Sequence, residues 1–255
     1  MDPNPRPSMK NGTNVIPIKP IAVAAPNGAL PAPCGTCHSR SYSLCACLSP
    51  DRLEELAHSV AKVRMSAHQT LFERGQPADT VYTVTSGALK LYSLMPDGRR
   101  QIIGFPYPGD QLNFGALAQY PFNCEALTET TLCRFSRAEY TEFLDRFPEL
   151  RQALTERTLD ELRLSQHQLA VLGRQTATER LASFLLQLLS KRSQVSANVV
   201  QLPMTRTDIA DYLGLTTETV SRSFSQFRRD GLISLNVAER VGLLDIPALT
   251  TLAGG

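Results

Sequence analysis

The sequence has little net charge and no long hydrophobic run. Its 26 Lys and Arg residues nearly balance 24 Asp and Glu residues, so the net charge of +2 gives no overall basic character that would indicate a nucleic-acid partner. The longest apolar run near the start is "IAVAA", residues 21–25, which is too short for a signal-peptide core or a membrane span. We therefore expect a soluble, cytoplasmic protein without a membrane partner, in which any DNA-reading surface is local.

Catalytic patterns are also absent. The sequence holds no Ser-His-Asp arrangement, no phosphate-binding loop and no paired carboxylates in a suitable context, and its four histidines are scattered. His38, beside Cys37, is interpreted as a solvated loop residue. Apolar residues make up 42% of the 255 residues, which is enough for a substantial core, so we expect a folded protein that is not an enzyme.

Cysteine, by contrast, is concentrated in one place. Four of the six cysteines lie in "PAPCGTCHSRSYSLCAC", residues 31–47, and the other two, Cys124 and Cys133, lie far along the chain. A reducing cytoplasm disfavours structural disulfides, so thiols gathered in one short polar stretch indicate metal or redox chemistry.

The residue pattern divides the chain into five parts. A proline-rich stretch without amphipathic period is expected to be a disordered leader, and the cysteine-rich loop follows it. Short β-rich runs come next, and helical periods after them. The expected boundaries are 1–33 for the leader, 34–48 for the loop, 49–147 for a β-roll domain, 148–173 for a long helix and 174–250 for a helix-turn-helix domain.

The β-roll is predicted from short strands and their turns. The stretch "SPDRLEELAHSVAKVRM" opens it with a short helix, which Ser49 caps and Pro50 starts. Runs such as "TVYTVTSGALKLYSL" and "EALTETTLCRFS" are rich in strand formers, and Asp97-Gly98 is a strong hairpin signal. Regular spacing of strands and turns is typical of a small barrel or roll.

The long helix carries a heptad-like series whose spacings alternate between three and four residues. This is typical of a coiled-coil seam, so we expect the helix to form a homodimer interface. The alternative is an ordinary amphipathic helix that packs on its own chain, as Leu150, Leu154 and Leu159 are expected to do. The seam residues, polar in the first half and more apolar in the second, are Thr155, Thr158, Leu162, Ser165, Leu169 and Leu172.

The stretch "TRTDIADYLGLTTETVSRSFSQFRRDGLI" has the outline of helix, glycine turn and helix. Thr205 or Thr207 caps the first helix, Gly214 suits a left-handed turn, and the second helix starts near Thr216. The exposed residues of the second helix are of types that read base edges, although a solvated charged face is the alternative. The expected DNA contacts are Thr217, Glu218, Ser221 and Arg222 on bases, and Arg228 and Arg229 on phosphates.

Together these parts resemble the FNR branch of the CRP/FNR superfamily of transcription regulators. The resemblance covers about residues 34–250 and is carried by "ETVSR", "MTRTDIADYLGLT" and "ATERLASFLL". It implies an α+β fold with an N-terminal β-roll of the cyclic-nucleotide-binding type, a long dimerisation helix and a C-terminal winged helix-turn-helix domain. It also implies a homodimer that binds palindromic double-stranded DNA, with half-sites like TTGAT, and that acts with RNA polymerase.

The resemblance further implies an oxygen-labile [4Fe-4S] cluster, which FNR proteins hold with three N-terminal cysteines and one cysteine of the roll. Four thiolates must converge on such a cluster, so a flexible loop can supply three and a rigid strand the fourth. Cys47 is interpreted as a spare thiol that could replace Cys45, and Cys124 as a buried, inert thiol. A structural zinc ion is the alternative. The implied ligands are Cys34, Cys37, Cys45 and Cys133.

A cyclic nucleotide is not expected as a ligand. Family members that bind cyclic AMP usually carry Gly-Glu-Leu followed by Arg-Ser or Arg-Thr, which hold the ribose and the phosphate. Here Ala116 stands in place of the glutamate, and Asn123, Cys124 and Glu125 stand in place of the arginine pair. Since an acid at that position repels phosphate, we expect the roll to keep the fold without the ligand.

The implied function is an oxygen-responsive transcription regulator that binds DNA as a dimer only while it carries the cluster. The hypothesis is that the cluster fixes the loop at residues 34–47 against the roll and the long helix, and so favours the dimer. Three alternatives stay open: a permanent dimer that only reorients its DNA-binding domains, a zinc-stabilised or otherwise cluster-independent regulator, and a sensor of nitric oxide.

Overall fold

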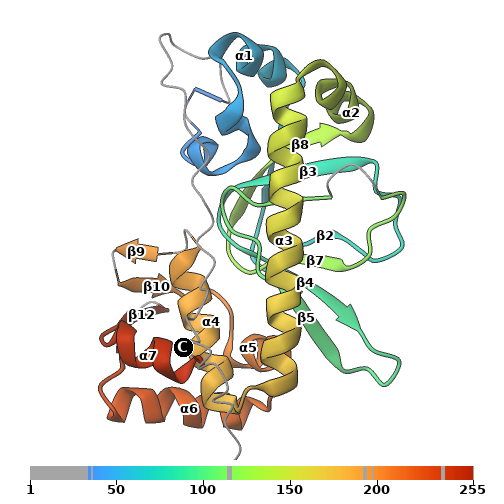
Figure 1. The fold of residues 1–255 in the computed structure, drawn as a ribbon. Coiled ribbons are helices and arrows are strands. Elements are labelled where there is room, and N and C mark those ends of the chain that lie inside the picture. Colours follow the sequence, from blue (N-terminus) through green and yellow to red (C-terminus); the bar gives the residue numbers. More distant parts are fainter. Residues whose placement is uncertain are drawn as a thin grey trace, which may run out of the picture.

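The structure is a computed structural model that describes residues 34–35, 37–113, 117–191, 194–196, 198–236 and 239–254. The leader expected at residues 1–33 and Ala116 lie outside these residues. A β-roll, a long helix and a helix-turn-helix domain follow one another along the chain, which confirms the predicted α+β fold (Figure 1).

The roll consists of two antiparallel four-stranded sheets. Its strands are β1 (Ala61–Met65), β2 (Thr70–Phe72), β3 (Thr80–Ser86), β4 (Leu89–Leu94), β5 (Arg100–Gly104), β6 (Gln111–Leu112), β7 (Asn123–Ala126) and β8 (Thr130–Ser136). One sheet has the order β1-β8-β3-β6 and the other the order β2-β7-β4-β5. Apolar side chains of both sheets, including Val84, Leu89 and Leu132, are fully buried in the core between them.

Two elements at the edges of the roll differ from expectation. The predicted helix that begins after Ser49 is α1 (Pro50–His58), and the rest of that stretch is β1, because its residues pair in register with β8 and bury Met65. Helix α2 (Arg137–Arg146) was not predicted, although Ser136 and Glu139 form the capping box that starts it.

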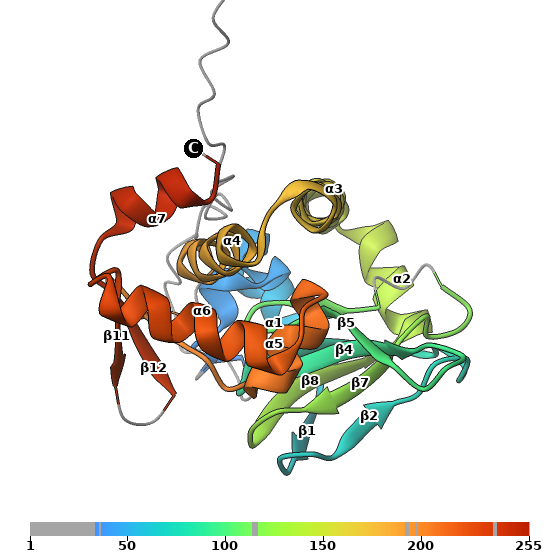
Figure 2. The ribbon, with the colours of Figure 1, turned by 90° about the horizontal axis from the view of Figure 1, so that it is seen from below.

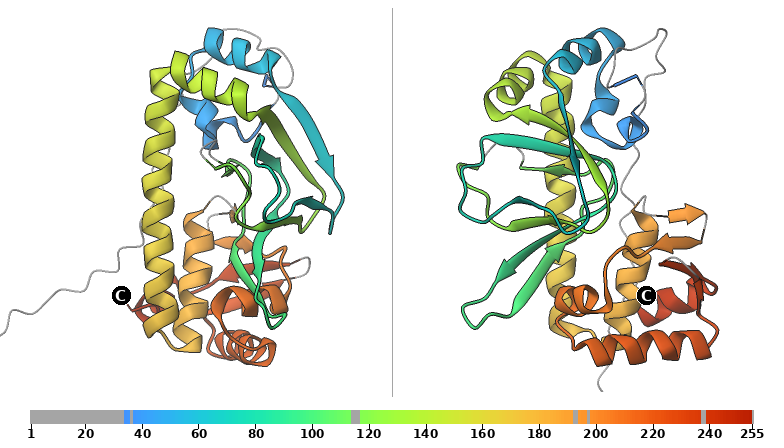
Figure 3. Two further views of the ribbon diagram at one scale, coloured as in Figure 1. Left: turned by 90° about the vertical axis from the view of Figure 1, so that its right-hand side faces the viewer. Right: turned by 180° about the vertical axis from the view of Figure 1, so that it is seen from behind.

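The long helix α3 (Pro148–Arg174) has 27 residues and ends one residue beyond the predicted boundary. It runs along one side of the molecule, from α2 at one end to the helix-turn-helix domain at the other (Figure 3). Its buried residues are Leu150 and Ala153 near the start and Val171 near the end, so most of its length presents side chains to solvent.

The C-terminal domain contains the predicted helix-turn-helix. Thr205 caps α5 (Arg206–Leu213) by accepting a hydrogen bond from the Asp208 N–H, and Gly214 follows with a φ of +62°. Thr216 caps the second helix. The other elements are α4 (Ala177–Ser190), β9 (Gln194–Ser196), β10 (Val199–Gln201), α6 (Thr217–Arg229), β11 (Ile233–Asn236), β12 (Arg240–Leu243) and α7 (Ile246–Leu252).

Arg180 joins the end of the long helix to the helix-turn-helix unit. From α4, its guanidinium donates hydrogen bonds to the carbonyl oxygens of Leu172 at 2.8 Å, Gln175 at 2.9 Å and Leu213 at 2.8 Å. Leu172 lies in the last turn of α3, and Leu213 ends α5. One side chain therefore satisfies carbonyl groups that the two helix ends leave without a partner in their own helices.

We expect Arg180→Met to lower the free energy of unfolding by about 3 kcal/mol, because three carbonyl groups lose a charged donor. Arg174→Met removes an exposed guanidinium from the same region and is expected to cost less than about 0.5 kcal/mol. Urea unfolding followed by circular dichroism measures both. Equal losses in the two variants would contradict the role assigned to Arg180.

Candidate cysteine site and DNA interface

Four cysteines from two distant segments line one small cavity. Two short 3₁₀ turns, η1 (Arg40–Tyr42) and η2 (Leu44–Cys47), shape the loop that carries Cys34, Cys37 and Cys45 to one side of it. Cys133 lines the other side from β8, between β1 and β3. The cavity has a volume of about 20 Å³, which is room for about one water molecule. The four thiols that were expected to share one ligand thus face one space.

Burial raises the pKa of the Cys34, Cys45 and Cys133 thiols and so favours their protonated forms. It raises the pKa of Cys45 to about 12; a hydrogen bond with Ser43 opposes this rise, and the nearby thiols of Cys34 and Cys133 add to it. Burial and the thiols of Cys37 and Cys34 likewise raise the pKa of Cys133 to about 12. Because metals bind the thiolate form, loading this site displaces protons.

The remaining two cysteines lie outside this group. Cys47 turns its thiol to the carbonyl oxygen of Leu44, at 3.0 Å, and Cys124 is fully buried in the core between the two sheets. Within the described parts of the chain, no three His, Cys, Asp or Glu side chains stand close enough together to hold a metal ion as they are. The donor set fits a thiolate-bound group in type and number, while the space between the thiols has room for about one water molecule.

The cysteine loop packs against the start of the long helix. Leu44 and Leu48 are buried in one apolar cluster with Leu150 and Ala153 of α3 and Phe135 of β8. A displacement of the loop therefore acts directly on the first turns of α3.

The loop also touches the turn before β6. Gly109 has a φ of +98°, and a Cβ atom there would lie 2.8 Å from both Cβ and the carbonyl oxygen of Tyr42. The adjacent Asp110 accepts a hydrogen bond from Arg157 of α3 at 2.6 Å, and its second oxygen lies 3.8 Å from Nζ of Lys191, which follows α4. Tyr42, this turn, α3 and the end of α4 thus form a continuous series of contacts.

The three leucines of the expected seam are largely exposed. Leu162 is 53% and Leu169 is 71% exposed, and Leu172 is half-buried. Of the residues expected to pack on their own chain, Leu150 is buried and Leu154 is half-buried. That expectation is wrong for Leu159, which is 48% exposed among the described residues.

The three hydroxyl-bearing residues of the seam are exposed as well. Each hydroxyl of Thr155, Thr158 and Ser165 donates a hydrogen bond to the carbonyl oxygen four residues earlier, at 2.8 to 2.9 Å. These residues would therefore bring no unsatisfied hydroxyl donor to an interface.

Helix α6 presents the expected DNA-reading residues to solvent. Its opposite face buries Val220, Phe224 and Phe227 in the domain core, and Figure 2 shows the helix lying across the end of the molecule. Hydrogen bonds from its own backbone N–H and from Thr216 lower the pKa of Glu218, so its carboxylate is an acceptor. Thr217 is half-buried and donates to Thr207 at 3.4 Å. The exposed members are Glu218, Ser221, Arg222, Arg228 and Arg229.

The residues at the expected phosphate position interact within the roll. The side-chain oxygen of Asn123 accepts a hydrogen bond from the backbone of Arg74 at 3.0 Å. Glu125 forms an ion pair with Lys90 of β4, with its oxygen 3.0 Å from Nζ. The glutamate position at Ala116 lies outside the described residues.

Known domains match both halves of the chain. Residues 62–147 match the cyclic nucleotide-binding domain, and residues 179–252 match the Crp-like helix-turn-helix domain. The nitrogen fixation regulation protein FixK of Bradyrhizobium diazoefficiens is 36% identical over 241 residues, which cover 92% of this chain and 99% of FixK. This chain belongs to the CRP/FNR family of transcription regulators.

Other members of the family are similarly close. The transcriptional activator protein FnrL of Cereibacter sphaeroides is 35% identical over 227 residues, covering 87% of this chain and 92% of FnrL. The solved structure of FixK2 from Bradyrhizobium japonicum has a TM-score of 0.71 at 34% identity and covers 76% of this chain and 96% of that chain. The Crp-like domain implies that the chain binds DNA, and members of the family act as dimers. Among the described helices, none is long and apolar enough to cross a membrane.

We expect Gly109→Ala to loosen the cysteine loop, because the added Cβ pushes against the backbone of Tyr42. Gly75→Ala is the matched control, since Gly75 also has a positive φ, +87°, but has open space around the Cβ position. Hydrogen exchange read by mass spectrometry should quicken at residues 37–48 only in Gly109→Ala. Unchanged exchange in that segment would show that the contact does not hold the loop.

Proposed function

We propose that the protein is an oxygen-responsive transcription regulator that binds palindromic promoter DNA as a dimer while it holds a [4Fe-4S] cluster. The observation that carries the proposal is the convergence of four thiols on one cavity, with Cys47 and Cys124 outside it. When bound, the cluster supplies oxygen-labile iron–sulfur bonds between the loop and β8. The proposed ligands are Cys34, Cys37, Cys45 and Cys133.

The loop is the part of the chain that would respond to loading. Its cavity has room for about one water molecule, so we expect the loop to shift when a larger group is bound. Leu44 and Leu48 then shift against the start of α3, and Tyr42 shifts against the turn at Gly109. These contacts support a transfer of the loop's position to the long helix.

The seam on α3 supports a dimer of marginal stability, whose equilibrium with the monomer a small change can shift. Leu162, Leu169 and Leu172 offer about 1.5–3 kcal/mol per fully buried side chain. Association costs an estimated 4–15 kcal/mol in lost freedom, so the seam alone is marginal. A modest change at the start of the helix then decides between monomer and dimer.

The recognition helix supports sequence-specific DNA binding. Arg222 suits guanine and Glu218 suits the cytosine of the paired strand, while Arg228 and Arg229 suit phosphates. Two such helices related by a dyad meet successive major grooves, and the site is therefore palindromic. Relatives that are named transcriptional activators support activation. An activator of transcription would have RNA polymerase as a further partner.

Contacts of Asn123 and Glu125 within the roll argue against a cyclic nucleotide as the signal. Glu125 and Asn123 are engaged inside the roll, and an acid stands where a phosphate would lie. A zinc-bound form of the same four thiols is the second candidate, because Cys₄ sites hold zinc equally well.

Substitution of each proposed ligand tests the site. Protein purified without oxygen should be brown and contain about four iron and four sulfide per chain. Serine at position 34, 37, 45 or 133 should abolish both, because one ligand is lost. Cys47→Ser and Cys124→Ser are the matched controls and should retain both. If the parent protein contained stoichiometric zinc and no acid-labile sulfide, the cluster hypothesis would be refuted and the zinc-bound form would be supported.

DNA reading is tested at two arginines of α6. Arg222→Ala should cost about 1–3 kcal/mol of binding and relax the preference for guanine in a TTGAT half-site. Arg229→Ala should weaken all sequences alike and lower the salt dependence, because it removes a phosphate contact. Fluorescence anisotropy with matched and mutated palindromes measures both. An unchanged guanine preference in Arg222→Ala would refute its assignment.

The seam is tested by adding an apolar contact to it. Ser165→Leu should increase the dimer fraction of air-exposed protein, because one more large side chain is buried at the interface. Gln166→Leu places the same side chain on the neighbouring exposed position, off the seam, and should leave the fraction unchanged. Sedimentation velocity reports the outcome, and an equal increase in the two variants would show that the seam is misassigned.

A further inference from the structure

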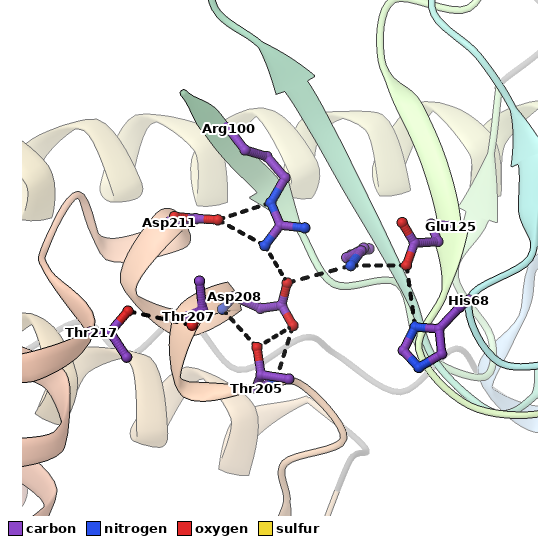
Figure 4. A network of polar contacts seen from close by, with 9 residues as sticks. His68, Arg100, Glu125, Thr205, Thr207, Asp208, Asp211 and Thr217 are labelled. Carbon is purple, nitrogen blue, oxygen red and sulfur yellow. Dashed lines mark hydrogen bonds and ion pairs between the residues drawn. The ribbon is translucent and has the colours of Figure 1, made fainter. Parts of the chain in front are cut away.

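Five charged side chains join the roll to the helix-turn-helix domain (Figure 4). We call Lys90, Arg100, Glu125, Asp208 and Asp211 the roll–α5 network. Nζ of Lys90, on β4, lies 3.0 Å from Glu125 of β7 and 3.4 Å from Asp208 of α5. Arg100, on β5, donates hydrogen bonds to Asp208 at 2.7 Å and to Asp211 at 2.8 Å. Both cations belong to the roll, and two of the three carboxylates belong to α5.

The centre of the network is buried. The side chain of Lys90 is 6% exposed and that of Asp208 is 4% exposed. Removal of one partner leaves the other charge desolvated and without compensation, which is strongly unfavourable. Burial opposes the ionised form of Asp208, but hydrogen bonds from Thr205 and the charges of Lys90 and Arg100 prevail and lower its pKa. The network therefore adds directional contacts to the apolar core that the two domains share, in which Phe105 of the roll packs on Tyr212 of α5, and neither Lys90 nor Asp208 can lose its partner while buried without a cost.

Asp208 also fixes the helix that carries it. Its carboxylate accepts hydrogen bonds from the backbone N–H of Thr205 at 3.0 Å and from the Thr205 hydroxyl at 2.7 Å, which completes the capping box of α5. The roll thus contacts α5 through the buried Asp208 of its first turn, and Arg100 also reaches Asp211 in the following turn.

Helix α5 in turn sets the direction of α6. The two helices are joined by the turn at Gly214 and share a core that includes Ile209 of α5 and Val220 and Phe224 of α6. Figure 1 places α6 at the end of the molecule where α3 finishes, Figure 2 shows it to one side of α3, which is seen end-on, and its exposed residues include Glu218 and Arg222. If the two-fold axis of the dimer runs parallel to α3, the recognition helices of both chains lie at the same end of the dimer.

We propose that Lys90 and Arg100 are positioning residues for DNA reading, through which the roll holds the recognition helix in the orientation that meets the major groove. The proposal rests on DNA binding alone and holds whichever group the cysteines bind. A dimer reads its site only if its two recognition helices stand about one helical turn of DNA apart. Helix-turn-helix domains that lose this network keep the apolar contact of Phe105 with Tyr212 but can shift on the roll, and the apparent affinity would fall with the fraction that remains competent.

The test compares neutral variants of neighbouring residues. Lys90→Met and Arg100→Met remove the cations of the network. Arg99→Met is the matched control, since Arg99 lies on the same hairpin, is 79% exposed and pairs with Asp97 of that hairpin. Arg100→Lys keeps the charge. Each variant, prepared without oxygen, is compared with the parent at a concentration where sedimentation shows equal dimer content and thermal unfolding shows a folded protein.

Two binding measurements report the orientation. The first is the affinity for a palindrome of TTGAT half-sites, and the second is the loss of affinity when one base pair is inserted between the half-sites. We expect Lys90→Met and Arg100→Met to bind the palindrome about tenfold more weakly, which is within the usual range of coupling between sites. Their affinity should also fall less than that of the parent when the base pair is inserted, because helix-turn-helix domains that are held less firmly can adapt to the new spacing. Arg99→Met should match the parent, and Arg100→Lys should lie near it.

The spacing measurement separates positioning from simple stability. If Lys90→Met and Arg100→Met keep the affinity and the spacing preference of Arg99→Met, the proposal is wrong. It is equally wrong if their affinity falls while the penalty for the inserted base pair stays as large as in the parent. If the parent itself prefers no palindrome, the proposed DNA site fails instead, and the network is then tested on the site that the protein selects.

Discussion

The apolar cluster beneath the cysteine loop is the contact on which the rest of the structure depends. Leu44 and Leu48 are buried there against α1, α2 and the start of α3. The described part of the loop forms two 3₁₀ turns and no strand, so no ladder of backbone hydrogen bonds attaches it to the roll. Its place is therefore set by side-chain contacts, which include this apolar cluster and the contact of Tyr42 with Gly109. Because side-chain contacts and not a strand hold this loop, its position can depend on what its cysteines bind.

The two ends of the long helix are held by different kinds of contact. At the start, apolar side chains link α3 to the cysteine loop, and such packing is non-directional and tolerates small shifts. At the end, the guanidinium of Arg180 binds carbonyl groups of α3 and α5, and the roll–α5 network fixes the first turn of α5. These polar contacts are directional and costly to break. The structure thus combines an adaptable contact near the cysteines with a rigid one near the DNA-reading helix, so dimerisation can change while the reading geometry within each chain is kept.

Local signals in the sequence predicted much of the fold. The helix cap, predicted at Thr205 or Thr207 and found at Thr205, and the glycine turn predicted at Gly214 are such signals. Strand β1 was mistaken for helix because its five residues have no strong local preference, and pairing with β8 decides their conformation. The capping box of Ser136 and Glu139 is a local signal for the start of α2, so this helix is predictable from the sequence alone.

The candidate site was only partly readable. The resemblance to FNR proteins, and not spacing, singled out Cys133 from Cys124, and the structure brings Cys133 to the cavity of the loop cysteines. No local pattern announces Arg180 or the pairing of Lys90 with Asp208, since their partners lie far away along the chain. Such contacts follow from how the domains dock, and docking is decided by surfaces that a one-dimensional pattern does not contain.

Sedimentation of the parent protein in two cluster states tests the central claim most directly. Protein purified without oxygen is measured at micromolar concentration before and after exposure to air, with iron and sulfide assayed in each sample. We expect dimers while the cluster is intact and chiefly monomers once it is lost. Dimers of unchanged stability in both samples would contradict control of dimerisation by the cysteine site.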